Sequence, residues 1–151
     1  MATATLKDQS LKDKADILTV IETLKTAHHN KDAAYLAARF TPDAAIFNLA
    51  PPLVHHGVDL HEKQEWFDSW DGPIEMEPKD FDITVSGDFA FCHGYMRMGG
   101  NKVGVDQRIS FWMRATFCLQ RSGDTWRIVH EHTSVPFSMD GNPRPVFDLK
   151  P

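Results

Sequence analysis

Trp126-Arg-Ile-Val-His-Glu-His-Thr-Ser-Val-Pro-Phe137 is the stretch of sequence that decides the fold. Its tryptophan, isoleucine and valine residues are typical of a buried strand, but it also carries two histidines, a glutamate, a threonine and a serine. Buried polar groups are tolerated where they bond to one another or face a cavity. The segment therefore predicts a sheet strand that contributes side chains to a pocket.

A hairpin turn joins this strand to the strand-like run before it. Ser122-Gly-Asp-Thr125 fits a two-residue turn in which the glycine supplies the positive φ that such turns need. This turn places Arg114 opposite Thr133. The face that we expect to line the pocket then carries Arg114, Thr116, Glu131 and Thr133. A three-residue loop would instead shift the register by one and place His132 opposite Arg114.

The other face of the preceding strand is wholly apolar. It carries Ile109, Phe111, Met113, Ala115, Phe117 and Leu119. We expect this face to lie on the outside of the sheet, where one chain of this size cannot easily cover it. A homodimer through the sheet is the predicted consequence.

Helical patterns precede the sheet. Apolar residues at spacings of three and four indicate an amphipathic helix over residues 13–30, and Asp32 is suited to cap a second, short helix. A strand at 44–49 separates these from a third helix over 57–71. Two alternating segments then precede the hairpin, at 81–86 and 89–98.

This order predicts an α+β fold, cone-shaped, with N-terminal helices packed on a strongly curved, mainly antiparallel sheet. The mouth of such a cone is a natural small-molecule site. We expect a flexible leader over residues 1–12, a single domain over 13–140 and an irregular tail over 141–151.

Composition limits the classes of function. The chain has 151 residues, with 42% hydrophobic and 25% charged residues, which is typical of one globular domain. The net charge is −5 and basic residues are scattered, which argues against nucleic acid as a partner. No apolar run suits a membrane span or a secretory signal. Cys92 and Cys118 fall in predicted strands without metal spacing, so we expect a cytoplasmic protein with reduced cysteines.

The whole pattern resembles the nuclear-transport-factor-2-like superfamily, and within it SnoaL-like and ketosteroid-isomerase-like proteins. Three stretches carry the resemblance, which covers residues 13–137: Asn48-Leu-Ala-Pro-Pro-Leu53, Arg114-Ala-Thr116 and the strand from Trp126 to Phe137. The resemblance implies a pocket that binds a small molecule. It does not imply one reaction, because this fold hosts many functions.

Departures from ketosteroid isomerase are informative. That enzyme uses an aspartate base, with a tyrosine and a protonated aspartate as the oxyanion hole. The base position corresponds here to Asn48, which cannot abstract a proton, and the tyrosine position falls near Leu24. The second aspartate falls near Thr116 or Cys118. We therefore expect that the chain is not a true ketosteroid isomerase.

The chain is also similar to the association domain of calcium/calmodulin-dependent protein kinase II. Cys92-His-Gly-Tyr-Met-Arg97 resembles a strand that bears a pocket arginine, and Gly57-Val-Asp-Leu-His61 resembles a helix that bears a pocket histidine. This comparison adds Arg97 and His61 to the candidate site. It also places Thr133 where the relative has a further arginine.

Each candidate residue has a chemical and a structural interpretation. Glu131 is a candidate general base, or the partner of Arg114 in an ion pair. Arg114 and Arg97 are candidate anion clamps, because guanidinium binds carboxylates with two parallel hydrogen bonds, or they pair with nearby acids. His61 is either a proton carrier or an exposed helix residue.

The remaining candidates would shape the pocket. We expect Asn48 to orient the ligand, and the other predicted lining residues are Trp66, Trp112, Thr116 and Thr133. Core filling explains the tryptophans equally well. His130 and His132 have the spacing of a metal site on a strand, but packed histidines are the favoured interpretation, so we expect no metal and no cofactor.

The sequence thus predicts a small-molecule pocket protein, with cofactor-free acid/base chemistry on a carbonyl or carboxylate compound. The alternative is a non-catalytic module for ligand binding or oligomerisation. The identity of the ligand does not follow from these residues.

Overall fold

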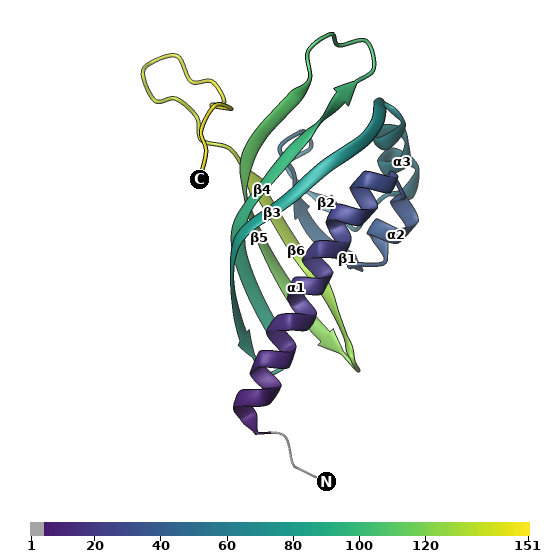
Figure 1. Cartoon of the computed structure of the whole chain (residues 1–151), viewed down its shortest axis with the longest axis vertical. Coiled ribbons are helices and arrows are strands. Elements are labelled where there is room, and N and C mark those ends of the chain that lie inside the picture. Colours follow the sequence, from purple (N-terminus) through teal and green to yellow (C-terminus); the bar gives the residue numbers. More distant parts are fainter. Residues whose placement is uncertain (1–4) are drawn as a thin grey trace.

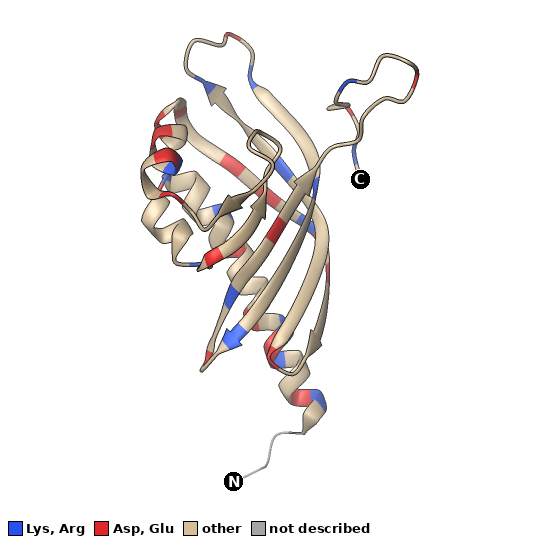
Figure 2. Cartoon of the chain, turned by 180° about the vertical axis from the view of Figure 1, so that it is seen from behind, with Lys and Arg blue, Asp and Glu red and all other residues tan. Residues whose placement is uncertain are grey.

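The structure, a computed structural model, describes residues 5–151. Three helices and one six-stranded sheet form two layers, with the helices covering one face of the curved sheet (Figure 1). This arrangement confirms the predicted α+β cone. Among the described residues, no helix is long and apolar enough to cross a membrane. Basic and acidic residues are interspersed along the described elements (Figure 2).

Helix α1 spans Leu6–Asn30, so it begins earlier than the sequence pattern predicted. The reason is a capping box: the Thr5 hydroxyl accepts from the Asp8 N–H, and the Asp8 carboxylate accepts from the Thr5 N–H. Part of the expected leader is therefore helical, and residues 1–4 lie outside the described residues. Ile17, Ile21 and Leu24 form the buried stripe of the helix.

The two short helices begin at aspartate caps. Asp32 caps α2 (Ala33–Ala37), as predicted, and its carboxylate accepts from the Tyr35 N–H at 2.9 Å. Asp59 caps α3 (Leu60–Asp68) in the same way. These caps fix where α3 starts, and hence which of its side chains face the sheet.

Six strands form the sheet, in the order β2-β1-β6-β5-β4-β3. They are β1 (Phe40–Phe47), β2 (His55–His56), β3 (Trp70–Ser86), β4 (Phe89–Lys102), β5 (Ile109–Ser122) and β6 (Thr125–Ser134). Every neighbouring pair is antiparallel except β1 and β6, which are parallel. The parallel pair brings the first strand of the chain against the last.

A β-bulge in β6 sets the register of the long hairpin. Near the turn, Leu119 pairs with Ile128, as the two-residue turn predicts. One step further, Cys118 pairs with His130, so Val129 is left without a partner. A bulge of this kind inserts one residue into one strand, and it reverses the faces of all residues beyond it.

The predicted register is therefore wrong beyond Leu119. Arg114 pairs with Ser134, whereas Phe117 pairs with Glu131. Arg114 no longer shares a face with Glu131, and the ion pair expected between them does not form. The outcome has the side-chain parity of the alternative register, but it arises from the bulge and not from a longer turn.

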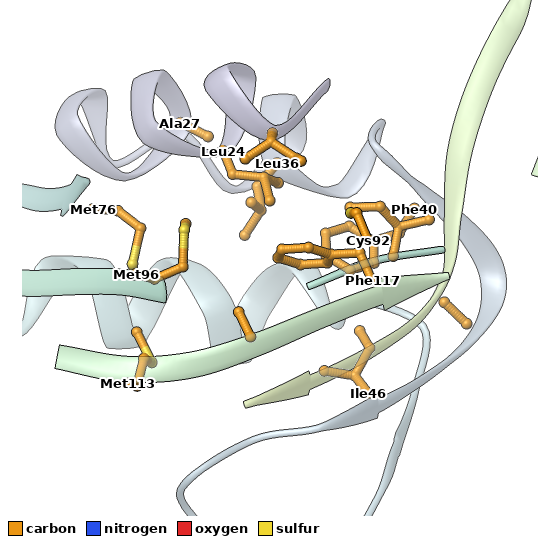
Figure 3. Close-up of a cluster of buried hydrophobic side chains, with 14 of the residues drawn as sticks. Leu24, Ala27, Leu36, Phe40, Ile46, Met76, Cys92, Met96, Met113 and Phe117 are labelled. Atoms are coloured by element: carbon orange, nitrogen blue, oxygen red, sulfur yellow. The ribbon is translucent and has the colours of Figure 1, made fainter. Parts of the chain in front are cut away.

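The apolar face of β5 was expected outside, and this expectation is also wrong. Phe117 is 1% exposed, and Met113 and Ala115 are buried with it. Figure 3 shows Phe117 close to Cys92 and Phe40, in the cluster that the helices cover. These residues form the core, so they cannot carry a dimer interface.

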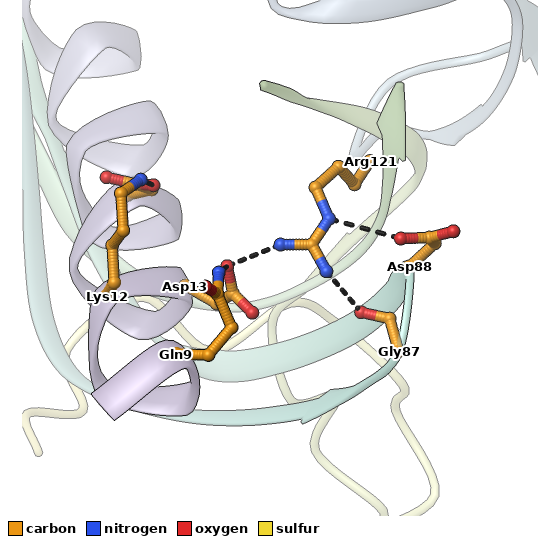
Figure 4. Close-up of polar contacts among 7 residues, drawn as sticks. Gln9, Lys12, Asp13, Gly87, Asp88 and Arg121 are labelled. Atoms are coloured by element: carbon orange, nitrogen blue, oxygen red, sulfur yellow. Dashed lines mark hydrogen bonds and ion pairs between the residues drawn. The ribbon is translucent and has the colours of Figure 1, made fainter. Parts of the chain in front are cut away.

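A cluster around Arg121 ties the N-terminal half of α1 to the sheet (Figure 4). Its guanidinium forms an ion pair with buried Asp13 of α1 and a second one, at 3.1 Å, with Asp88. It also donates to the Gly87 carbonyl at 3.0 Å and lies 4.8 Å from the centre of the Trp126 ring. The cluster thus joins α1 to the β3–β4 turn and to the residues that flank the β5–β6 turn.

Replacing Asp13 by alanine is expected to lower the free energy of unfolding by about 2 kcal/mol, because a buried acceptor of charged donors is lost. Urea denaturation of the wild-type and variant proteins measures this change. Asp16→Ala is the matched control, since Asp16 pairs only with exposed Lys12 on the helix surface. Equal effects of the two substitutions would show that the Arg121 cluster does not stabilise the fold.

Candidate functional site

A cavity of about 390 Å³ lies between the helices and the covered face of the sheet. All layers of the fold contribute to its wall, which is largely apolar: Leu24, Leu36, Phe40, Ile46, Trp66, Met76, Met96, Met98, Met113 and Phe117. Figure 3 shows three of these methionines, Met76, Met96 and Met113, and Met96 of β4 pairs with Met113 of β5. A cavity of this size and lining suits a small organic molecule.

Glu131 brings a carboxylate to this wall. It stands opposite Phe117 of β5 and beside Ile46 of β1. Among residues 5–151 its carboxylate has neither an ion pair nor a hydrogen bond, and its half-buried side chain borders the cavity. Burial raises the pKa of Glu131 to about 7, although the positive charge of Lys63 opposes the shift. Glu131 therefore exchanges a proton near neutral pH.

Lys63 of α3 also lines the cavity. Its Nζ lies 4.8 Å from the centre of the Trp66 ring and 5.8 Å from that of Phe67. Burial lowers the pKa of Lys63, because it disfavours the ammonium form, while Glu131 opposes this effect. Each of the two groups affects the other, yet they form no direct ion pair in the described chain.

His28 of α1 is the third titratable group in the wall. Its Nδ1 lies 2.7 Å from the Leu24 carbonyl oxygen, so this nitrogen carries the proton and donates it. Burial, with a smaller contribution from the charge of Lys63, lowers the pKa of His28 to about 4, although the hydrogen bond to the Leu24 carbonyl opposes the shift. The imidazole is therefore neutral at physiological pH, with Nε2 as an acceptor.

Polar groups also mark the mouth of the cavity. Asn48 follows β1, and the Thr133 hydroxyl donates to the Phe47 carbonyl at 3.4 Å. His55 and Glu62 meet there with 3.9 Å between Nδ1 and Oε2. A ligand that enters can thus place apolar parts inside and polar parts at the mouth.

Four of the sequence-predicted site residues meet in this cavity. They are Glu131, Asn48, Trp66 and Thr133. The last strand thus borders the cavity, which lies on the face of Phe117 and not on that of Arg114.

The other predicted residues lie elsewhere. Arg114 is exposed and donates through Nε to the Ser134 hydroxyl at 3.1 Å, and Arg97 pairs with Glu75 at 3.1 Å. Thr116 and Trp112 share the outward face of β5 with Arg114. The His61 side chain is 83% exposed. The Val129 bulge explains why Thr116 and Arg114 do not share a face with Glu131.

His130 and His132 lie on the outward face of β6, with ring centres 6.3 Å apart. The His130 Nδ1 is 2.7 Å from the Ala45 carbonyl oxygen, and the ring packs edge-on against Phe47. In the part of the chain that the structure describes, no group of three histidine, cysteine, aspartate or glutamate residues could hold a metal ion.

Among the cavity residues that the sequence interpretation missed are Lys63 and His28. Lys63 precedes Trp66 by three positions, which places the two side chains on one face of a helix. His28 continues the apolar stripe of α1. Those spacings were the available signals, but neither shows that the facing sheet leaves a cavity.

The fold and this cavity define a cone of the nuclear-transport-factor-2-like type. The model of the SnoaL-like domain family matches residues 17–138, and the chain belongs to this family. No curated protein matches the sequence.

Solved structures extend the comparison. An NTF2-like protein of unknown function from Pseudomonas putida KT2440 is 28% identical, with a TM-score of 0.80, over 94% of this chain and 99% of that one. A proposed scytalone dehydratase from Novosphingobium aromaticivorans DSM 12444 is 14% identical, with a TM-score of 0.75, over 91% and 93%. A proposed ketosteroid isomerase from Shewanella frigidimarina NCIMB 400 is 18% identical, with a TM-score of 0.61, over 77% and 92%. The last two show the shared fold.

The cavity groups predict opposite dependences of stability on pH. The pKa of Glu131 is about 7 in the fold and 4.5 without it, so the folded state binds more protons in this range and loses stability as pH rises. The pKa of His28 is about 4 in the fold and 6.5 without it, so the folded state loses stability as pH falls. The two contributions oppose each other where the ranges overlap.

Single substitutions separate the contributions of Glu131 and His28 to the pH dependence of stability. Glu131→Gln is expected to stabilise the protein increasingly as pH rises through the Glu131 range, by up to about 2–3 kcal/mol. His28→Gln should instead gain relative stability as pH falls through the His28 range. Denaturant unfolding at a series of pH values measures both, with Glu65→Gln on the surface of α3 as control. A difference from wild type that does not change with pH would contradict the assignment of that group.

Proposed function

We propose that the cavity binds a largely apolar carbonyl or carboxylate compound, and that Glu131 transfers a proton to or from it. The observation that carries this proposal is a carboxyl group without a partner in the described chain, facing an apolar cavity, with a pKa of about 7. A general acid or base works best when its pKa lies near the operating pH. Glu131 meets this condition because its surroundings desolvate the carboxyl group.

The chemistry follows from the position of Glu131. As a carboxylate, it takes a proton from the carbon next to the carbonyl group of the bound compound. As a carboxylic acid, it returns this proton to another carbon, which gives isomerisation, or to a leaving hydroxyl group, which gives elimination. Proposed dehydratases and a proposed isomerase among the similar structures support this class of reaction.

The surrounding residues support binding and orientation. The Asn48 amide and the Thr133 hydroxyl offer hydrogen bonds near the mouth, while the Trp66 ring contributes an apolar surface. Roles for His61, Arg97, Arg114, Trp112 and Thr116 stay predictions from the sequence. Because their side chains lie outside the cavity lining, we assign proton transfer to Glu131.

Proton abstraction can be measured without knowledge of the natural substrate. In D₂O, the wild-type protein is expected to accelerate deuterium exchange next to the carbonyl of apolar ketones such as 2-tetralone, as followed by NMR. Glu131→Gln should reduce this acceleration about 100-fold or more, since general base catalysis contributes at least that factor. Glu65→Gln makes the same chemical change on the surface and should leave the rate unchanged.

The same experiment decides between the two function classes. Unchanged exchange in Glu131→Gln would remove Glu131 from the mechanism. Ketone binding without any exchange in the wild-type protein would instead select the non-catalytic ligand-binding module.

We also propose a homodimer, now through the outward face of the sheet. Exposed aromatic side chains on that face support it: Phe47 is 38% exposed, Phe91 48% and Tyr95 37%. Apolar surface of this kind is commonly covered by a partner.

A cytoplasmic location stays a prediction from the sequence.

Phe91→Glu is expected to convert the dimer to monomers, because it places a charge in the proposed interface. Sedimentation velocity over a dilution series gives the mass of each form. Leu18→Glu is the control, since Leu18 is exposed on α1 in the other layer. A wild-type protein that sediments as a monomer at tens of micromolar would end the proposal.

A further inference from the structure

Lys63 differs from the other lysines whose contacts the structure shows. Lys12 and Lys25 form ion pairs with Asp16 and Glu77. Three others donate hydrogen bonds: Lys31 to the Trp70 carbonyl, Lys79 to the Pro151 carbonyl and Lys102 to the Ser69 hydroxyl. Of the lysines in residues 5–151, only Lys63 lines the cavity, and its Nζ lies over aromatic rings without a hydrogen-bond acceptor.

The surroundings of Lys63 decide its protonation state. Glu131 faces it from β6 and His28 from α1, while Asp59 and Glu62 on α3 and His55 on β2 lie towards the mouth. Ionised Glu131 and the aromatic rings favour the ammonium form. Desolvation outweighs them and lowers the pKa of Lys63, and His28 is neutral and offers no negative charge. A neutral amine is thus more accessible at this position than on the surface.

A neutral amine in an apolar cavity is a nucleophile for carbonyl carbon. We propose that Lys63 is a covalent carbonyl site, at which Nζ forms an imine with an apolar aldehyde or ketone held in the cavity. This inference rests on the proposed function, whose substrate class it narrows from carbonyl or carboxylate compounds to aldehydes and ketones. It gives Lys63 a role that acid/base chemistry by Glu131 alone does not require.

The step balances with the groups present. The Nζ lone pair forms a bond to the carbonyl carbon, and the carbonyl oxygen takes up a proton to give a carbinolamine. The carbon–oxygen bond then breaks, and the oxygen leaves as water with both protons that the amine has lost. Glu131, which titrates near neutral pH, can carry the proton that the departing hydroxyl needs. The apolar wall limits the return of water and so protects the imine from hydrolysis.

Reductive trapping tests this site in the wild-type protein. We would incubate the protein with 3-phenylpropanal and sodium cyanoborohydride near neutral pH, and map phenylpropyl-lysine by peptide mass spectrometry. Lys63 is expected to be labelled at least tenfold faster than exposed Lys14 of α1, which serves as the internal standard. The excess labelling rate of Lys63 over Lys14 should saturate with aldehyde concentration. It should decrease when 3-phenylpropan-1-ol, which has no carbonyl group, competes for the cavity.

Two variants complete the test. Lys63→Arg keeps the charge but has no primary amine, so it should lose only the fast phase of labelling. Lys14→Arg makes the matched change on the surface and should keep that phase.

Binding of 3-phenylpropan-1-ol, measured by calorimetry, distinguishes failure of the site from failure of the proposed function. Equal labelling of Lys63 and Lys14 together with alcohol binding would overturn the imine while the cavity proposal stands. Equal labelling without any binding would overturn both.

Discussion

The unpaired residue Val129 is the constraint on which the rest of the site depends. Apolar residues of β5 must face the helices, because they form the core with Phe117 at its centre. The turn alone would then direct Glu131 outward, towards solvent. One extra residue in β6 reverses the parity and brings Glu131 inward. The bulge therefore allows the apolar side chains of β5 and the Glu131 carboxylate of β6 to lie on the same face of the sheet.

This arrangement has an energetic cost that other parts of the fold offset. A carboxyl group and an amine face an apolar cavity without forming an ion pair, so both are desolvated and neither is fully compensated. At the opposite end of the fold, Arg121 connects α1 with two turns of the sheet, and the apolar stripe of α1 is fully covered. The Arg121 cluster and buried Ile17 and Ile21 stabilise the fold outside the cavity lining, whereas Leu24 of the same stripe borders the cavity.

Local chemistry accounts for what the sequence predicted correctly. Asp32 begins a helix because its carboxylate caps it, and Gly123 allows the tight turn, so both could be recognised from a few neighbouring residues. The bulge could not, because it depends on packing between β6, β5 and the helices, which lie far apart in the sequence. Lys63 was missed for the same reason: a helix pattern shows which residues share a face, but not whether the facing sheet leaves a space. The resemblance predicted the fold correctly, whereas the placement of Arg114 and Thr116 relative to Glu131 depended on the register of one hairpin.

The wall of the cavity has a consequence for selectivity. Met76, Met96, Met98 and Met113 come from three neighbouring strands, and methionine is unbranched, with several rotatable bonds and a polarisable sulfur. Such side chains rearrange around guests of different outline at little cost, unlike the rigid branched residues that shape a narrow slot. The cavity therefore distinguishes only weakly between ligands of different shape. Its preference among ligands is set by the position of the ligand oxygen relative to the few polar groups of the cavity. We therefore expect it to bind several related compounds and not a single one.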